Sequence, residues 1–380
     1  MRYFAHLAAA RTDALFYEAP QPFFRDAPRE LLRFAVGALL YTPATGRRLA
    51  DMARRPPWPG LKALGFCLED SVGEAERQSA QKNLMRQVRR LTDLTQAGDL
   101  NLEDLPLLFV RVKDYAMLEA MQPFFQENIP TLTGVILPKV NLARLQACLP
   151  LVAEINRRAV SPFYVMPILE DEEIAASAER LLLLQRMREL LDQYYPYVLN
   201  IRIGATDCCG LYGIRRSAAT PSGRLNLLAA YIADIARIFA LRDRYTISAP
   251  VWEYFPQAAD PGSGRGPVEE QPELAGLFAE CDLDLQNGLI GKTAIHPSQL
   301  LPIQAMHAVE RETYADAMDI AEAAASARGV FASAGRNKMN EPKPHEIWAR
   351  RILKQAAVYG VLNRGVSRLD LWRAATGGGV

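Results

Sequence analysis

Short apolar segments bounded by polar or turn residues recur along this chain. Runs of this length are typical of strands that are buried on both faces of a parallel sheet. Eight such strands are predicted, at residues 36–41, 63–68, 107–112, 134–138, 163–169, 198–203, 245–249 and 292–295.

Amphipathic segments with helical periodicity lie between these strands. They include residues 74–94, 142–158, 173–191 and 225–240. Eight strands alternating with helices match the (β/α)8 TIM barrel, an α/β fold, in number and order. We therefore predict an N-terminal arm over residues 1–35, a barrel over 36–311 and a C-terminal helical extension over 312–380.

Two segments outside the regular alternation carry their own expectations. The extension is predicted to hold helices at 314–327 and 345–359, separated by a loop at 329–343. The segment 256–272 follows the seventh strand and is rich in Gly, Pro, Asp and Glu. Because a barrel keeps its active site on the loops that follow its strands, we expect this segment to be a mobile lid.

Composition limits the range of partners. The 380 residues carry a formal net charge of +1, which gives no overall attraction to nucleic acid or to an anionic membrane. No stretch is long and apolar enough to span a bilayer, and residues 1–7 contain no continuous signal core. We expect a cytoplasmic protein.

The five cysteines agree with that compartment. Their number is odd, they are scattered, and none belongs to a C-x-x-C pair. The vicinal Cys208 and Cys209 are expected to be small buried residues rather than a redox or metal pair.

Two acidic residues stand where predicted strands end. Glu170 closes the fifth strand, and Asp207 follows the sixth in Gly204-Ala205-Thr206-Asp207. The C-terminal strand ends of a barrel build its active site, so two hard oxygen ligands there suggest Mg²⁺ with positions open for substrate and water. The alternative is that Glu170 belongs to a group of acids at a helix N-terminus and that Asp207 is a cap.

A second acidic pair and an arginine lie on neighbouring strands. Glu69 and Asp70 close the second strand, where Asp70 or Ser71 could instead cap the following helix. Arg111 lies inside an apolar strand, and burying a cation is costly unless it is paired. Arg111 is therefore expected to face a carboxylate, either one of this pair or that of an anionic substrate.

Three further motifs give weaker indications. Lys139 ends the fourth strand and could form a Schiff base, although such a lysine is more often an ion-pairing residue. His296 follows the eighth strand and could bind substrate or anchor a loop. Residues 289–293, Leu-Ile-Gly-Lys-Thr, resemble the end of a P-loop, but the first glycine is missing and a helix precedes where a strand is required.

Taken in order, these motifs resemble the citrate lyase β-subunit family, which includes HpcH/HpaI-type aldolases. The resemblance runs from about residue 40 to residue 351 and rests on short motifs that follow one another in the family's order. They are Leu-Tyr-Thr-Pro at 40–43, Leu-Glu-Asp-Ser at 68–71, Arg-Val-Lys at 111–113, Leu-Pro-Lys at 137–139, Pro-Ile-Leu-Glu at 167–170, Gly-Ala-Thr-Asp at 204–207 and Gly-Lys-Thr-Ala-Ile-His-Pro at 291–297.

The resemblance implies a Mg²⁺-dependent barrel (Mn²⁺ could replace it) that makes or breaks a carbon–carbon bond next to a carbonyl. It implies that Glu170 and Asp207 are metal ligands and that Arg111 binds the carbonyl or enolate oxygen. Residues 336–342 resemble the family's C-terminal stretch, which often reaches a neighbouring subunit. Glu341 thereby becomes a candidate proton donor in trans within a homo-oligomer, for which the family suggests a trimer. The alternative is that Glu341 is a solvated loop acid.

The chain also departs from the family pattern. Lys113 stands where the family usually has asparagine, Asp171 where it has threonine, and Glu341 where it has aspartate. The metal chemistry survives these changes, whereas the family's acyl-CoA and citryl substrates do not follow from it.

The leading hypothesis is a lyase or aldolase that acts on a 2-oxo acid, a hydroxy acid or an acyl-CoA-type substrate. Arg111, Glu69, Asp70 and Glu341 are its candidate catalytic residues. Substrate binding is assigned to Arg111, to the backbone of Gly204, Ala205 and Thr206, and to Lys139 and His296. The alternatives are a metal-free aldolase that uses Lys139, and a non-catalytic barrel that binds a metabolite.

Overall fold

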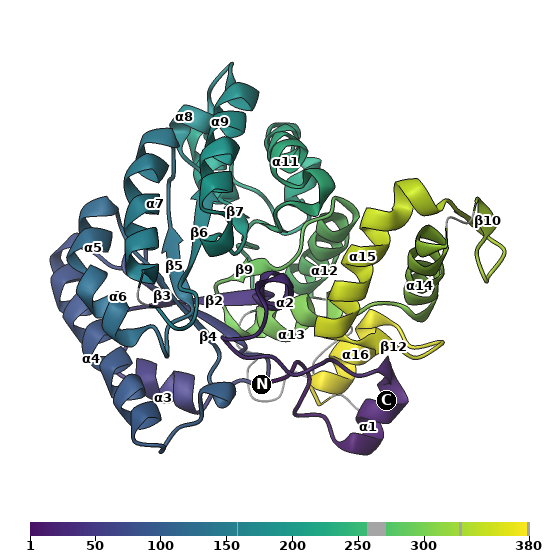
Figure 1. The fold of residues 1–380 in the computed structure, drawn as a ribbon, viewed down its shortest axis with the longest axis horizontal. Helices are drawn as coiled ribbons and strands as arrows, with labels where there is room; N and C mark the ends of the chain where they lie inside the picture. Colours follow the sequence, from purple (N-terminus) through teal and green to yellow (C-terminus); the bar gives the residue numbers. More distant parts are fainter. Residues whose placement is uncertain (158, 257–270, 327–328, 378–380) are drawn as a thin grey trace.

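Eight parallel strands form the central sheet of the computed structural model, which describes residues 1–157, 159–256, 271–326 and 329–377. Their bounds are β2 Ala38–Pro43, β3 Ala63–Cys67, β4 Leu107–Arg111, β5 Gly134–Leu137, β6 Tyr164–Leu169, β7 Ile201–Ile203, β8 Ile247–Ser248 and β9 Lys292–Ala294. Their order is β8-β7-β6-β5-β4-β3-β2-β9, and a parallel bridge between Ala249 and Lys292 joins the two edges into a barrel (Figure 1). The predicted TIM-barrel fold and its eight strands are confirmed.

Helices surround this barrel. Their bounds are α3 Leu49–Arg54, α4 Arg77–Gln96, α5 Tyr115–Ala120, α6 Gln122–Asn128, α7 Leu142–Asn156, α8 Glu172–Ala175, α9 Arg180–Gln193, α10 Ala205–Leu211, α11 Asn226–Phe239, α12 Pro272–Gln286 and α13 Leu300–Met306. The single helix predicted at 173–191 is instead two, α8 and α9. The Ser177 hydroxyl accepts a hydrogen bond from the Glu179 backbone N–H between them, a local bond that competes with helix formation.

Strand side chains alternate between two apolar layers. Leu40, Leu64 and Val110 belong to the layer packed beneath the surrounding helices, whereas Phe109 and Met166 belong to the layer that fills the barrel. This alternation follows from the two-residue period of a strand, and it directs every second residue towards the barrel axis.

The N-terminal arm contains α1 Ala9–Leu15, β1 Phe16–Glu18 and α2 Arg29–Ala35. The apolar layer that fills the barrel continues into this arm and into the end of α15 (Pro342–Tyr359), because Tyr3 and Tyr359 belong to the same cluster. Their rings stack with centroids 4.8 Å apart, and their hydroxyls donate to the Ala35 and Phe34 carbonyl oxygens. The arm thus covers the barrel at the start of β2.

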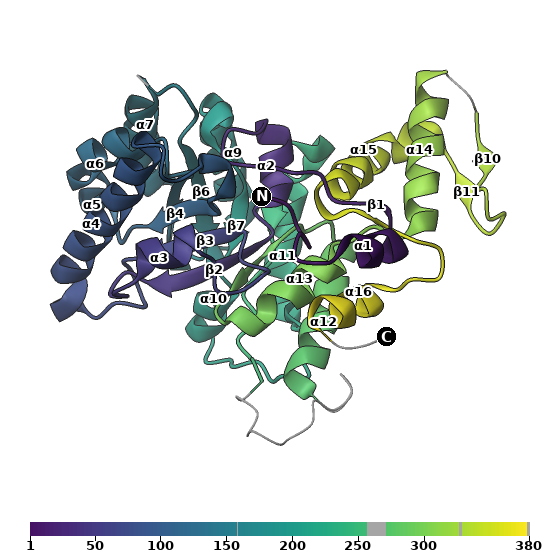
Figure 2. The same cartoon turned by 90° about the horizontal axis from the view of Figure 1, so that it is seen from below.

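The C-terminal extension lies to one side of the barrel (Figures 1 and 2). Its elements are α14 Arg311–Ala325, β10 Phe331–Ala332, β11 Met339–Asn340, α15, β12 Val361–Leu362 and α16 Arg368–Ala375. Both predicted helices are present as α14 and α15, but the predicted loop at 329–343 contains the antiparallel pair β10–β11. The strand β12 pairs antiparallel with β1, so the extension is hydrogen-bonded to the N-terminal arm.

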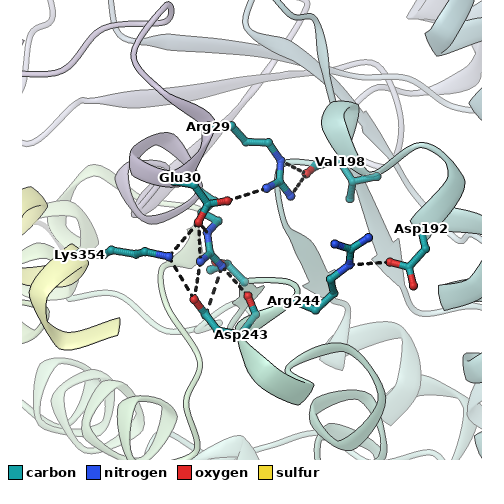
Figure 3. A network of polar contacts seen from close by, with 9 residues as sticks. Arg29, Glu30, Asp192, Val198, Asp243, Arg244 and Lys354 are labelled. Atoms are coloured by element: carbon teal, nitrogen blue, oxygen red, sulfur yellow. Dashed lines mark hydrogen bonds and ion pairs between the residues drawn. The ribbon is translucent and has the colours of Figure 1, made fainter. Parts of the chain in front are cut away.

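Ion pairs attach α15 to the barrel side (Figure 3). Lys354 Nζ lies 2.9 Å from Glu30 Oε2 on α2 and 3.3 Å from Asp243 Oδ2, just before β8. Asp243 also accepts from the buried Arg33. One carboxylate therefore connects the arm, the extension and the barrel, while the proposed division into three parts stays a prediction.

Three further expectations concern the lid, a membrane span and the cysteines. The predicted lid at 256–272 falls largely on residues 257–270, which lie outside the described residues. Among the described helices, none combines the length and the hydrophobicity needed to cross a bilayer. All five cysteines are buried and free, as predicted for Cys208 and Cys209.

Candidate active site

The charged residues singled out in the sequence gather where the barrel strands end. Arg111 is the last residue of β4, and the others follow β3, β5, β6 and β7 in turn: Glu69 and Asp70, Lys139, Glu170 and Asp207. Parallel strands in register bring these ends to the same mouth of the barrel.

Arg111 is a buried cation that contacts three carboxylates. Its Nη2 lies 2.6 Å from Glu69 Oε2, 3.3 Å from Asp70 Oδ2 and 3.5 Å from Glu170 Oε1. Only 7% of Arg111 is exposed, so these contacts offset the cost of burying its charge. The expected pairing of Arg111 is thus observed.

Lys139 joins the same acidic pair from the other side. Its Nζ lies 2.9 Å from Glu69 Oε1, 3.2 Å from Asp70 Oδ1 and 3.6 Å from Asp207 Oδ1. Desolvation lowers the pKa of Lys139, but the hydrogen bond that its ammonium donates to Glu69 and the surrounding negative charge outweigh this effect and raise the pKa above its ordinary range. A Schiff-base lysine needs the opposite shift, so this environment favours ion pairing.

The backbone of Lys139 is held in an uncommon conformation. Its φ is +49°, in the left-handed region that non-glycine residues seldom adopt, and its N–H donates to Glu170 Oε1 at 3.0 Å. Backbone strain of this kind clusters at functional sites, where the surrounding structure over-determines it. Here the strained residue orients the Glu170 carboxylate.

Glu170 is a buried acid of the mouth that could hold a metal. Burial raises the pKa of Glu170 to about 8; Arg111 opposes this shift and Asp207 adds to it. Asp207 lies in the first turn of α10 with about a third of its side chain exposed (35%). The two carboxylates are therefore close enough to interact, one of them buried and the other open to solvent.

This pair fits a divalent cation of the Mg²⁺ type. A bound cation would stabilise the ionised form of Glu170, which burial and Asp207 now disfavour. Within the described ranges no group of three or more His, Cys, Asp or Glu residues forms a complete metal cage. Two carboxylates that leave positions for water and substrate are the donor set that Mg²⁺ commonly takes.

The capping alternatives are decided residue by residue. Neither Asp70 nor Ser71 caps the helix after β3, because Gly73 and Glu76 occupy the cap positions there. Asp171 does cap α8, where its side chain accepts from the Glu173 N–H. The acid that follows Glu170 thus has a structural role, whereas Glu170 itself points to Arg111.

The remaining candidate residues lie further from this centre. Ala205 and Thr206 form the start of α10, and the Thr206 hydroxyl donates to Glu253 Oε1 at 2.7 Å. His296 hydrogen-bonds to Ser298 and stacks on Phe255 beyond β9. Glu341 is the N-cap residue of α15 in the extension, where its N–H donates to His345. The acids that contact Arg111 in the described part of the chain are Glu69, Asp70 and Glu170, and not Glu341.

Sequence reasoning overlooked three residues at or beneath the mouth: Tyr41, Arg202 and Glu253. The Tyr41 ring lies 5.4 Å from the Arg111 guanidinium. Arg202 carried the same signal as Arg111, a cation within an apolar strand. Glu253 gave no signal, because its loop position has no periodicity.

Lys292 confirms that the apparent P-loop is not one. Its Nζ is buried and lies 2.8 Å from both Glu280 Oε1 and Asp284 Oδ2. A buried lysine that is paired with two acids is not available to bind a phosphate group.

Comparison with known proteins now identifies the family. A family model described as a C-C bond lyase of the TIM-barrel fold matches residues 30–361. The chain belongs to this family. It is accordingly an enzyme of the carbon–carbon lyase class, as its resemblance to the citrate lyase β-subunit family implied.

Solved structures with the same fold agree. The protein CitE from Mycobacterium tuberculosis, in complex with magnesium, acetoacetate and coenzyme A, is 19% identical with a TM-score of 0.53, over 85% of this chain and 99% of that chain. A citrate lyase from Burkholderia xenovorans LB400 is 15% identical with a TM-score of 0.56, over 84% and 91%. At these identities the likeness shows the fold alone. A search of curated proteins gives no match.

Proposed function

We propose that this lyase is Mg²⁺-dependent and cleaves or forms the carbon–carbon bond next to the carbonyl of a 2-oxo acid, hydroxy acid or acyl-CoA-type substrate. The observation that carries the proposal is the contact of buried Arg111 with Glu69, Asp70 and Glu170 at the mouth shared with Asp207. Magnesium in the related CitE complex supports the choice of ion.

Glu170 and Asp207 would hold the cation, with Mn²⁺ as a possible substitute. When bound, the cation would supply a Lewis acid that polarises the substrate carbonyl. Arg111 places its fixed charge beside Glu170, where an enolate oxygen would develop. A preorganised donor of this kind is worth roughly 3–4 kcal/mol of transition-state stabilisation.

Glu69 and Asp70 orient the two cations of the mouth. Each acid contacts both Arg111 and Lys139, so the pair fixes the position of the guanidinium and of the ammonium relative to each other. Lys139 then offers a protonated group to a substrate carboxylate, as do the backbone N–H groups at the start of α10.

The proton would be moved by water or by Glu341. Glu341 would come from a neighbouring chain, and for this reason the proposed enzyme is a homo-oligomer. Glu341 directly precedes α15, which lies in the extension to one side of the barrel (Figure 1), and this position supports a contribution in trans. No acid of the extension contacts Arg111 or Glu170 in the described part of the chain.

A basic cavity beside the mouth supports a substrate with a phosphate-bearing tail, such as an acyl-CoA. The cavity of about 690 Å³ follows β2 and includes Arg47, Arg48, Arg54 and Arg55 in its lining. Coenzyme A in the related CitE complex agrees with this assignment.

Metal binding and proton exchange test the proposal together. Calorimetry with Mg²⁺ should show binding to the wild type, and NMR in D₂O should show Mg²⁺-dependent exchange of the pyruvate methyl protons. Glu170→Gln and Asp207→Asn should each abolish both signals while leaving the circular dichroism unchanged. A Schiff-base aldolase would instead be indicated by two results together: proton exchange that persists in the presence of a chelator, and substrate trapped on Lys139 by borohydride. Wild-type protein that binds Mg²⁺ but exchanges no protons would favour a non-catalytic barrel.

A further inference from the structure

Arg202 is a cation buried inside the barrel, and none of the acids in the described part of the chain pairs with it. It lies on β7 between Ile201 and Ile203, which face the outer layer, and only 1% of it is exposed. Its Nη2 donates to Thr293 Oγ1 on β9 at 2.6 Å. Within the described ranges its Nε and Nη1 have no hydrogen-bond partner.

Two buried hydroxyl groups lie beside Arg202. Ser248 Oγ belongs to β8, in direct register with Arg202, and it is fully buried with no hydrogen-bond partner among the described residues. Tyr41 Oη belongs to β2 and interacts with the Arg202 guanidinium, whose charged form it stabilises. Gly65 makes room for the Tyr41 ring, since a Cβ there would lie 2.8 Å from Tyr41 Cδ1. Three strands thus direct buried hydrogen-bond donors to one place, and none of the three donors is paired with an acid among the described residues.

Two other buried arginines of the protein show what Arg202 lacks. Arg33 is paired with Asp243, and Arg216 lies 2.7 Å from Glu280. A buried guanidinium without such a partner is expensive, and burial lowers the pKa of Arg202. An anionic group that enters this place would satisfy the cation and both hydroxyls at once.

The distance between Arg202 and the proposed metal-binding acids determines how long a ligand must be to contact both. The register partner of Arg202 on β6 is Ile168, two residues before Glu170. Two residues along a strand span about 7 Å. Arg202 therefore lies one layer of side chains below Glu170, a separation comparable with the length of a short dicarboxylic acid.

We propose that Arg202, Tyr41 and Ser248 form a carboxylate subsite at the floor of the active site. It would receive the far carboxylate of a dicarboxylic 2-oxo acid whose 2-oxo acid end lies at Glu170 and Asp207. A free small carboxylate has the same chemistry and could occupy it instead. The inference rests on the proposed function, because it assumes that the substrate sits at those two acids.

The binding test compares a dicarboxylate with a monocarboxylate. With Mg²⁺-loaded protein, calorimetry should give a Kd for oxaloacetate that rises roughly 10- to 100-fold in Arg202→Gln, because a charged hydrogen bond is lost. The Kd for pyruvate should change less than about threefold. Ser248→Ala should weaken oxaloacetate by roughly fivefold, in the same direction. Equal effects on the two ligands would overturn the subsite.

A second test needs neither metal nor activity. Without anions, metal-free Arg202→Met should melt at the same temperature as the wild type or above it, because an unpaired buried charge is removed. Malonate should raise the melting temperature of the wild type and of Arg202→Lys, but not that of Arg202→Met. A lower melting temperature for Arg202→Met, with no malonate effect on the wild type, would make Arg202 a structural residue and contradict the inference.

These outcomes separate the inference from the proposed function. If Mg²⁺ binding and pyruvate exchange are observed but the preference for oxaloacetate does not depend on Arg202, the inferred subsite is contradicted and the proposed function stands. If acetate stabilises the wild type, but Arg202→Gln weakens the binding of oxaloacetate and of pyruvate equally, the site holds a free anion. The role of the site in binding substrate is then overturned. If Mg²⁺ does not bind, the proposed function fails, and the malonate test still reports on Arg202.

Discussion

Gly204 determines how closely the Glu170 carboxylate lies against the end of β7. A Cβ at this position would lie 2.0 Å from Glu170 Oε2 and 2.4 Å from Glu170 Cβ. Real Cβ atoms do not approach so closely, so any side chain at Gly204 would move the carboxylate. The geometry of the proposed metal site thus depends on a residue that touches no metal.

Replacing Gly204 by alanine should therefore damage metal binding more than folding. We expect Gly204→Ala to weaken Mg²⁺ binding by at least about tenfold, or roughly 1.4 kcal/mol, because Glu170 is displaced. Calorimetry measures this change. The control is Gly210→Ala on α10, where a Cβ meets nothing within 4 Å and the helix should gain slightly in stability. The same loss of affinity in both variants would contradict the role of Gly204.

At this scale, the sequence indicated which residues matter better than it indicated how they pair. Arg111 and Glu170 could be recognised because charge at the end of an apolar strand is unusual. The contact of Lys139 with Glu69 could not be recognised, because the two residues are 70 positions apart in the sequence and meet only through the register of their strands. The left-handed backbone of Lys139 has no sequence signal either, since no glycine or asparagine marks it.

Strand β9 and helix α13 are joined through one buried histidine, His307. Its Nε2 accepts from the Gly291 N–H at 2.9 Å, and its Nδ1 lies 2.6 Å from the Ile303 carbonyl oxygen, to which it donates. The bond to Nε2 requires the neutral ring, because a protonated Nε2 cannot accept, whereas Nδ1–H donates to Ile303 in either state. Burial lowers the pKa of His307 to about 4, against an ordinary value of about 6.5.

This histidine should make the fold less stable in acid. Above about pH 6.5 the ring is neutral in the folded and unfolded states, and its contribution is complete. As pH falls from 6.5 to 4, only the unfolded chain takes up the proton, so the free energy of unfolding should drop by about 3 kcal/mol. Urea denaturation across this range should show a smaller drop for His307→Gln. An equal drop in both proteins would contradict the assignment.

Long apolar elements were predictable, and short paired ones were not. The eight barrel strands were visible because each is an apolar run between turn residues. The pairs β1–β12 and β10–β11 involve only two or three residues per strand, too few for a period. The division of 173–191 into α8 and α9 follows from one serine side chain, which a helical pattern does not exclude.

At the scale of the whole molecule, the extension and the barrel mouth belong to different parts of one chain. Glu341 lies on the extension, and Arg111 lies at the mouth. If Glu341 acts in trans, chains carrying Glu341→Gln and chains carrying Arg111→Ala should each be inactive alone. Mixed after partial dissociation, they should recover a measurable fraction of the pyruvate exchange, because some sites then combine two intact residues.

The control for this mixing experiment is each variant mixed with itself. Native mass spectrometry should confirm that the mixed oligomers form. Mixed oligomers without recovered exchange, or Glu341→Gln chains with full activity alone, would contradict a role for Glu341 in trans. A monomeric wild type would exclude it altogether.

The pairing of β1 with β12 also has a consequence for biosynthesis. The ribosome makes Phe16 early, yet its partner Leu362 emerges only after the whole barrel has been translated. Until then the backbone of β1 has no strand to pair with. Strand β1 must therefore stay unpaired until Leu362 has been made, so the closure of this two-stranded sheet is a late step that follows synthesis of the barrel.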